Sequence, residues 1–322
     1  MPRCAINRKA QLLCLEAVQQ SERLRIESSK LDCGATVLDF GVDAIGGIGA
    51  GILLARICLA DLADVTLLPC DPSLGSYPLL QVSTDAPVQA CMASQYAGWP
   101  VQLEKYFAMG SGPMRARRGK EHVLQALQII EPESISVGVL ECEKLPSDAV
   151  CEMIAHECDI EPSHLTLCVA PTRSIAGVIQ VVARSIETSL HKLFELGFDL
   201  NQILSAHGTA PLPPPAKGFA EGIGRTNDAI LYGGRVTLWV KAEDEAIEKV
   251  ASKVPSGTSK DWGRPFADTF KDYGYDFYKV DPGLFAPAEI QILNLNSGRS
   301  WSFGSMRPDV LQSSFLSAYV SD

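Results

Sequence analysis

The 322-residue sequence lacks two features that each define a large class of proteins. Basic residues are scarce: 28 lysines and arginines face 38 aspartates and glutamates, which gives a net charge of −10. This balance argues against a protein of nucleic acid or anionic membrane surfaces, because both require a positive face. Long apolar runs are also missing. The most apolar long stretch, Ala44–Ala55, is too short for a bilayer and suits a buried helix.

Cysteine is absent from the last 154 residues of the chain. The ten cysteines are spread between Cys4 and Cys168, whereas a small secreted scaffold would space them more densely. The first twenty residues contain four charged side chains and no secretory apolar core, their longest apolar run being Leu12–Leu15. We therefore expect a cytoplasmic protein with reduced, mostly buried thiols.

Strand-like and helix-like segments alternate along the chain, which predicts an α/β (α+β-like) fold of one or two lobes. The proline-rich segment Thr209–Gly218 cannot be helical and is the best candidate for a linker. The predicted strands are 35–40, 135–140, 165–170 and 235–241, and the predicted helices are 7–26, 52–62, 147–157, 175–196 and 244–253.

A glycine-rich turn, Gly46–Gly51, lies between a predicted strand and a predicted helix, where a dinucleotide-binding loop would be found. Gly47 and Gly49 fit the first two glycines of that motif, but its third position falls on Ile52. The spacing therefore indicates a tight turn with close backbone packing rather than a cofactor loop.

Two further groups of residues could carry chemistry. Cysteines and histidines gather over 151–168, and a metal-dependent hydrolase would use Cys158, His164 or Cys168, although their spacing matches no compact zinc pattern. A basic run, Arg115–Lys120, is either a solvated surface or an attractor of an anionic substrate. Gly110, Ser111 and Gly112 precede it and could expose backbone N–H groups to an anion.

The predicted helix 175–196 is apolar well beyond a single stripe, which is typical of a helix buried on most sides. Within it Gln180, Arg184, Glu187 and His191 follow a 4-3-4 spacing that would align them on one face. Burying an arginine and a glutamate is costly unless a network or a function requires it. A buried glutamate is a competent general base, and a neighbouring arginine keeps it ionised, so the pair could deprotonate a water.

Several segments match one family, in order and over nearly the whole chain. They are Ile57–Leu59, Leu62–Val65, Ser94–Trp99, Tyr106–Pro113, Val169–Thr172, Arg184–Thr188, Thr226–Asp228 and Leu284–Ala288. On these segments the sequence resembles the methenyltetrahydromethanopterin cyclohydrolases. The resemblance implies a hydrolase of one-carbon metabolism that interconverts 5,10-methenyltetrahydromethanopterin and water with 5-formyltetrahydromethanopterin, a carrier pathway also used by methylotrophic bacteria in formaldehyde oxidation.

The resemblance further implies an enzyme without metal or added cofactor, a homotrimer, and two α/β lobes per subunit with the pterin pocket between them. The lobes would form one catalytic unit over residues 1–322, and they could interleave in sequence. The family's catalytic arginine and glutamate correspond to Arg184 and Glu187. Its active-site segment corresponds to Gln95, Tyr96 and Ala97, with Ser94 beside it in the substrate site. Some relatives have lysine where this chain has Tyr96.

From this resemblance we expect Glu187 to take a proton from water as it attacks the electrophilic methenyl carbon, with Arg184 orienting the water. Asn227 or Asp228 could accept hydrogen bonds from the pterin ring, although the residue types slightly favour an Asx cap at a helix or turn start. The alternatives are a catalytically silent pterin-binding scaffold protein and the metal-dependent hydrolase described above. No nucleic-acid or membrane partner is expected.

Overall fold

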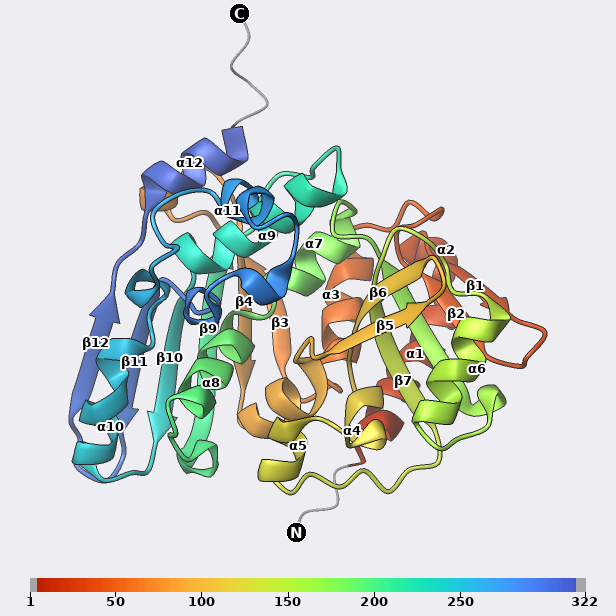
Figure 1. Cartoon of the computed structure of the whole chain (residues 1–322), viewed down its shortest axis with the longest axis horizontal. Helices are drawn as coiled ribbons and strands as arrows, with labels where there is room; N and C mark the ends of the chain where they lie inside the picture. The colour runs from red at the N-terminus through yellow and green to blue at the C-terminus, as the bar shows by residue number, and fades with distance from the viewer. Residues whose placement is uncertain (1–4, 317–322) are drawn as a thin grey trace, which may run out of the picture. The chain divides into compact units, whose positions relative to one another are not determined.

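The computed structural model describes residues 5–316, and these divide into two compact units that interleave along the chain. Of the described residues, the first unit comprises 5–63 and 89–180, and the second comprises 64–88 and 181–316. Both units combine helices with a six-stranded mixed sheet (Figure 1). The predicted α/β class is confirmed, whereas a substrate pocket between the lobes stays a prediction. No helix among the described residues is long and apolar enough to span a membrane.

The sheet of the first unit has the strand order β1-β2-β8-β7-β6-β5, in which β2, β8 and β7 run parallel. Its strands are β1 (Glu27–Lys30), β2 (Thr36–Asp39), β5 (Trp99–Leu103), β6 (Tyr106–Ser111), β7 (Ser136–Glu141) and β8 (Leu165–Ala170). Its helices are α1 (Ile6–Gln19), α2 (Ser21–Leu24), α3 (Ile48–Cys58), a π-helix (Val88–Gln95, beginning at the unit boundary), α4 (Met114–Arg118), α5 (His122–Ala126), α6 (Asp148–Glu157), the 3-10 turn Pro162–His164 and α7 (Ile175–Val182).

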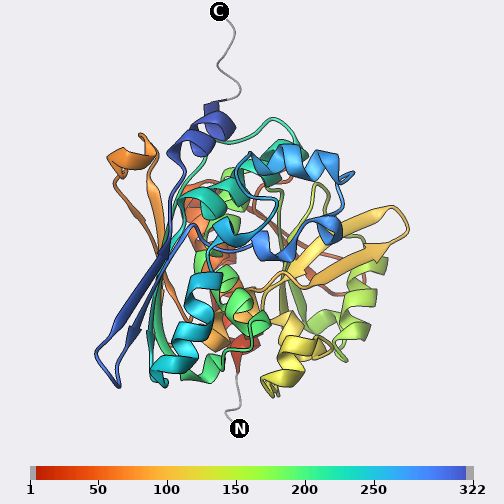
Figure 2. The same ribbon diagram turned by 60° about the vertical axis from the view of Figure 1, so that its left-hand side comes forward.

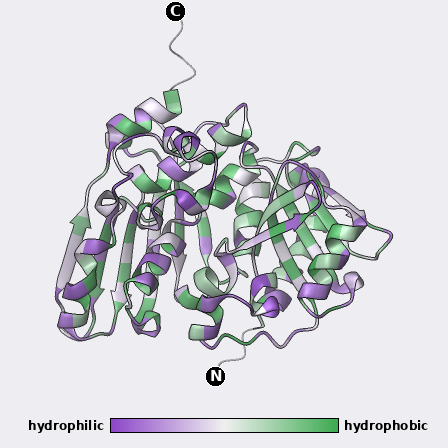
Figure 3. Cartoon of the chain, in the orientation of Figure 1, coloured by the Kyte–Doolittle hydropathy of each residue, from purple (hydrophilic) through white to green (hydrophobic). Residues whose placement is uncertain are grey.

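Two apolar clusters cover the two faces of this sheet. One joins α1 and α3 to alternate residues of β2, β7 and β8, and the other joins α6 and α4 to the residues between them. Every residue of β8 is consequently buried, which explains why its sequence is apolar at every position except Thr166. Apolar colouring along these central strands and α3 is visible in Figure 3.

The sheet of the second unit has the order β12-β11-β10-β9-β4-β3, and only β10 and β11 are parallel. Its strands are β3 (Asp64–Leu68), β4 (Leu79–Thr84), β9 (Ile203–Pro211), β10 (Arg235–Val240), β11 (Glu289–Asn294) and β12 (Ser300–Gly304). Its α-helices are α8 (Ser185–Glu195), α9 (Phe219–Gly233), α10 (Asp244–Val250), α11 (Phe266–Asp272) and α12 (Pro308–Leu316), with 3-10 turns at 72–74, 200–202, 251–253, 256–258, 277–279 and 282–284. Burial alternates along β4 and β10, and α8 and α9 pack on the buried face (Figure 2).

The prediction of one long helix over 175–196 is wrong, because the chain forms two helices, α7 and α8, separated at Ala183 and Arg184. No proline or glycine lies at the break. The first helix packs closely in the first unit, where a side chain on Gly51 would collide with Ile179. The second packs in the second unit against Gly208 of β9. Tertiary packing therefore interrupts a helix that the local sequence would continue.

The glycine-rich segment is a tight turn, as predicted, but α3 begins earlier than expected, at Ile48. Gly46 has a positive φ of 62°, which suits glycine, and its N–H donates to the Arg25 carbonyl. The buried carboxylate of Asp39 accepts four backbone N–H groups of residues 41–44 at 2.7–2.9 Å. An internal carboxylate therefore binds the N–H groups of the loop that leads into the Gly46 turn, and these groups are not available to an external anion.

The proline-rich segment 209–218 lies inside the second unit, and the chain instead crosses between units at 63/64, 88/89 and 180/181. Its first residues, Thr209–Pro211, complete β9 and pair with β4. Pro211 pairs with Leu79 at the end of the strand, a position where a missing N–H costs little.

Candidate active site

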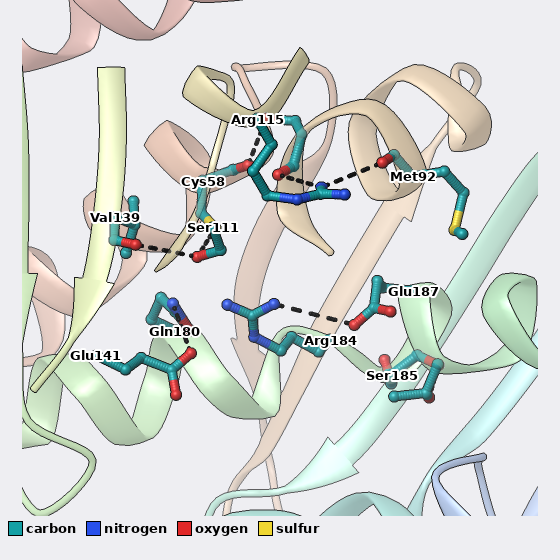
Figure 4. A network of polar contacts seen from close by, with 12 residues as sticks. Cys58, Met92, Ser111, Arg115, Val139, Glu141, Gln180, Arg184, Ser185 and Glu187 are labelled. Carbon is teal, nitrogen blue, oxygen red and sulfur yellow. Dashed lines mark hydrogen bonds and ion pairs between the residues drawn. The ribbon is translucent and has the colours of Figure 1, made fainter. Parts of the chain in front are cut away.

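The break between α7 and α8 determines the geometry of Arg184 and Glu187. Arg184 is the N-cap residue of α8, and Glu187 lies in the first turn of that helix. Both side chains are buried, and Arg184 Nη1 lies 3.9 Å from Glu187 Oε2, an ion-pair distance (Figure 4). A carboxylate in the first turn also interacts favourably with the positive end of the helix dipole. The arrangement is a buried, charge-stabilised carboxylate, which suits proton transfer.

Contacts with the sheet hold the first turn of α8 in place. A Cβ on Gly208 of β9 would lie 2.5 Å from Ser185 Oγ and 2.9 Å from Ile186. Only glycine therefore allows the backbone of β9 to approach the turn that carries Arg184 and Glu187. The sequence contains no recognisable signal for this contact, since it joins residues from separate elements.

The break separates Gln180 from the other three residues of the predicted helical face. Gln180 belongs to α7 in the first unit, where its Nε2 donates to Glu141 Oε1 at 3.4 Å. His191 lies on α8, with its Nε2 3.8 Å from Glu195 Oε1. The predicted alignment of all four residues on one continuous helix is therefore wrong, while the Arg184–Glu187 pair is retained.

The predicted segment Ser94–Ala97 begins at the end of the π-helix in the first unit. The Ser94 hydroxyl donates to the Cys58 carbonyl at 2.6 Å, and the Tyr96 N–H donates to the Cys91 carbonyl at 2.8 Å. Gln95 is fully buried, while Tyr96 and Ala97 are partly exposed. π-Helical turns are rare and are frequently found at functional sites, which agrees with the role predicted for this segment.

Gly110 and Ser111 form the end of β6 rather than an open loop. Gly110 pairs with Trp99 on one side and Leu140 on the other, so its backbone lies within the sheet. The buried Ser111 hydroxyl donates to the Val139 carbonyl at 3.3 Å. Gly112, with a φ of 86°, makes the turn into α4. The predicted anion-binding N–H groups are therefore directed to neighbouring strands at Gly110 and Ser111.

The basic run makes intramolecular contacts, which neither predicted interpretation anticipated. Arg115 is fully buried and pairs with Glu121. The other three basic side chains contact the C-terminal end of α6 and the residues that follow: Arg117 donates to the Cys158 carbonyl, and Arg118 and Lys120 pair with Glu157. Cations at the C-terminal end of a helix complement its dipole.

Asn227 and Asp228 lie well inside α9, so the predicted cap at a helix start is wrong. Asn227 donates to the Ile223 carbonyl one turn earlier. Asp228 is completely buried, and its Oδ1 accepts the N–H of Phe266, the first residue of α11. Burial raises the pKa of Asp228 to about 7. Asp228 thus caps the start of α11. This hydrogen bond uses one of the two carboxylate oxygens proposed to accept from the pterin ring.

The cysteines and histidines of 151–168 do not assemble into a metal site. Cys168 is buried with its Sγ 3.7 Å from Cys14 Sγ, whereas His164 is exposed. Burial raises the pKa of Cys151 to about 12 and that of Cys158 to about 11, which disfavours the thiolate that binds metals. Within residues 5–316 no group of three or more His, Cys, Asp or Glu side chains has a geometry that could hold a metal ion.

Comparison with known proteins identifies the family of the chain. The family model described as Cyclohydrolase (MCH) matches residues 5–315, and the chain belongs to this family. Among its relatives, the methenyltetrahydromethanopterin cyclohydrolase of Rhodopirellula baltica is 55% identical over 289 residues, which cover 88% of this chain and 86% of the relative. Proteins of the same name from Methylobacillus flagellatus and Methanosarcina barkeri are 42% and 43% identical, and each alignment covers 97% of this chain and at least 95% of the relative.

Proposed function

We propose that this chain adds water reversibly to 5,10-methenyltetrahydromethanopterin to give 5-formyltetrahydromethanopterin. The proposal rests on the chain's family and on the names of its relatives. The structural observation that carries it is the buried ion pair between Arg184 and Glu187 at the start of α8. Such a pair can take a proton from an attacking water, so the reaction needs no covalent intermediate on the enzyme. Proton transfer is sufficient because the substrate is already electrophilic.

The methenyl group is an amidinium-like cation, so its bridging carbon accepts a water oxygen directly. As the C–O bond forms, Glu187 takes one proton of the water and a neutral hydroxyl adduct results. Glu187 then gives that proton to N10 as the C–N10 bond breaks. The hydroxyl proton leaves to solvent, the C=O bond forms, and the formyl group remains on N5. One water is consumed and one proton is released overall, and the reverse reaction follows the same steps.

In this mechanism Arg184 stabilises the Glu187 carboxylate and the developing charge on the attacking oxygen. Gln95 and the backbone of Tyr96–Ala97 contact the water or the formyl oxygen. A tyrosine in place of the lysine found in some relatives supplies a neutral hydroxyl rather than a cation. Ser94, Gly110, Ser111, Gly112 and Asn227 support the substrate site through the backbone segments that they stabilise.

The decisive experiment compares Glu187→Gln with a matched control on the same helix, Glu195→Gln. The side chain of Glu195 is largely exposed. Purified protein, treated with a chelator, is mixed with methenyltetrahydromethanopterin, and loss of the methenyl absorbance is followed. We expect Glu187→Gln to lower kcat by at least 100-fold while the substrate still binds, because an amide cannot accept the proton. Glu195→Gln should retain the wild-type rate.

Two outcomes would contradict the proposal. Near-normal turnover by Glu187→Gln would remove the general-base role, and tight binding without turnover by the wild-type chain would identify a silent pterin-binding protein. Retention of activity after chelation supports the further proposal that the reaction needs neither metal nor added cofactor. Activity that is lost on chelation and restored by zinc would refute that proposal.

We propose in addition that the enzyme is a cytoplasmic homotrimer whose partner is the small pterin substrate alone. These properties derive from the family resemblance. Light scattering on the purified chain tests the trimer directly, since a mass near that of one or two chains would refute it.

A further inference from the structure

Arg115 on α4 is a fully buried charged side chain in the first unit. Burying a guanidinium group is unfavourable unless its charge is paired and its N–H groups are hydrogen bonded. Glu121 supplies the charge: its Oε1 accepts from Arg115 Nε at 3.0 Å, and its Oε2 pairs with Arg115 Nη2. This two-oxygen contact fixes the plane of the guanidinium.

The remaining Nη1 group of Arg115 is directed at the end of the π-helix. It donates to the Met92 carbonyl at 3.2 Å and to the Ser94 carbonyl at 3.3 Å (Figure 4). Carbonyls at the end of a helix have no partner within it, so a guanidinium is a suitable cap. The two contacts hold the backbone immediately before Gln95.

The other side of Gln95 is held by the same guanidinium. Arg115 Cζ lies 4.7 Å from the centroid of the Tyr96 ring, which is a cation–π distance. Gly98 provides the space for this ring, because a Cβ there would lie 2.5 Å from Tyr96 Cε1 and 2.9 Å from Glu121 Oε2. Arg115 therefore contacts the chain on both sides of Gln95.

We propose that Arg115, held by Glu121, is the positioning residue that sets the conformation of the substrate-contacting segment Gln95–Ala97. The inference rests on the proposed function, which assigns substrate contact to that segment. This role of Arg115 differs from the capture of an anionic substrate, because its N–H groups bind Glu121 and backbone carbonyls and its guanidinium lies over the Tyr96 ring.

The first test compares Arg115→Lys with Arg118→Lys. Arg118 is a matched control, because its guanidinium also lies over an aromatic ring (Trp99, 4.3 Å) and pairs with a glutamate, Glu157, yet it does not contact the 92–96 backbone. A lysine at 115 can pair with Glu121 but cannot also reach both carbonyls and the ring. We expect kcat to fall at least tenfold with less than a threefold change in KM, and we expect no loss with Arg118→Lys.

A double-mutant cycle separates positioning from general stabilisation. Gln95→Ala is combined with Arg115→Lys and, as the control, with Arg118→Lys. If Arg115 acts through the segment, the loss caused by Arg115→Lys shrinks to less than threefold in the Gln95→Ala background. A purely structural role predicts the same fold-loss in both backgrounds, and that result would overturn the inference.

A second variant keeps the inference testable if Arg115→Lys does not fold. Glu121→Gln preserves an acceptor for Arg115 Nε but removes the charge that orients the guanidinium, so we expect the same non-additivity with Gln95→Ala. Additive losses in this cycle would overturn the inference as well. A wild-type chain without cyclohydrolase activity would instead refute the proposed function, because every comparison here is made relative to measured wild-type turnover.

Discussion

Buried charged side chains in this protein have specific partners, and the partners differ in what they do. Glu187 lies beside an arginine at a helix start, Arg115 is enclosed by a glutamate and backbone carbonyls, and Asp228 caps a neighbouring helix. A buried charge without such partners would be strongly unfavourable. The same burial makes each of these residues sensitive to a change of charge.

Asp228 provides a pH-dependent test at this scale. Its pKa of about 7 in the folded chain lies above the ordinary value of 3.8, so its stabilising contribution is present below pH 4 and is lost as pH rises to about 7. Above pH 7 the cost of the ionised form reaches about 4 kcal/mol. Asp228→Asn keeps the acceptor for the Phe266 N–H and should be more stable than wild type at pH 8, with a flatter stability profile.

Urea unfolding at pH 5 and pH 8 measures this difference. Asp309→Asn is the matched control, because pairing with Arg307 lowers the pKa of Asp309 to about 2 and it stays ionised throughout that range. The control should keep the wild-type pH dependence. An equal loss of stability from pH 5 to pH 8 in wild type and Asp228→Asn would show that Asp228 is not the titrating group.

At the scale of elements, specific side-chain contacts organise the segments that join strands to helices. The loop after β2 shows how a single side chain organises such a segment: Asp39 binds four successive N–H groups of residues 41–44. The Gly46 turn and the first turn of α3 follow directly. This loop sits at the carboxyl edge of a parallel strand, where α/β proteins often bind ligands, yet its own carboxylate uses the donors.

Asp39→Ala tests this arrangement. Removing the carboxylate leaves four backbone donors without their acceptor in a partly buried loop, so we expect a loss of about 3 kcal/mol in the free energy of unfolding. Asp43→Ala is the control, because the Asp43 side chain is exposed and its own N–H would still reach Asp39. Denaturant titration of both variants measures the effect. Equal stabilities for the two variants would contradict the assigned role of Asp39.

At the scale of the whole molecule, neither unit is a continuous segment of chain. The second unit takes β3 and β4 from residues 64–88, and its other strands come from 203–304. Strand β4 pairs with β9 along its whole length, with Leu79 opposite Pro211 and Thr84 opposite Ala206. A chain lacking 64–88 would expose β9 as a long unpaired edge.

A pair of fragments tests this dependence. Residues 181–322 alone should aggregate or unfold without a cooperative transition, whereas 64–88 joined to 181–322 by a long Gly/Ser linker should unfold cooperatively in urea. The joined chain with Val82→Asp is the control, because Val82 is buried on β4 and a charge there should prevent pairing. Cooperative unfolding of 181–322 alone, at the same midpoint as the joined chain, would contradict the prediction.

Much of the fold was predictable from local pattern. The fully buried strand 165–170 was predicted with its observed bounds, and β7 and β10 within one residue, because apolar periodicity reports burial within a single segment. The helix α9 was missed, since glycines and a preceding proline-rich stretch weaken its signal. Among the candidate site residues, the Arg184–Glu187 pair was identified from its unusual charge on an apolar helix.

The sequence by itself determined the α/β class and the family, and it singled out Arg184 and Glu187 as the candidate pair, because each of these depends on residue types and short spacings. Tertiary structure alone decided the break before α8, the burial of Arg115 and the capping role of Asp228. Each of these depends on contacts between segments distant in the sequence, such as Arg115 with Met92 and Asp228 with Phe266. A local pattern reports how polar a residue is, but only the folded chain supplies the partner that makes burying its charge favourable.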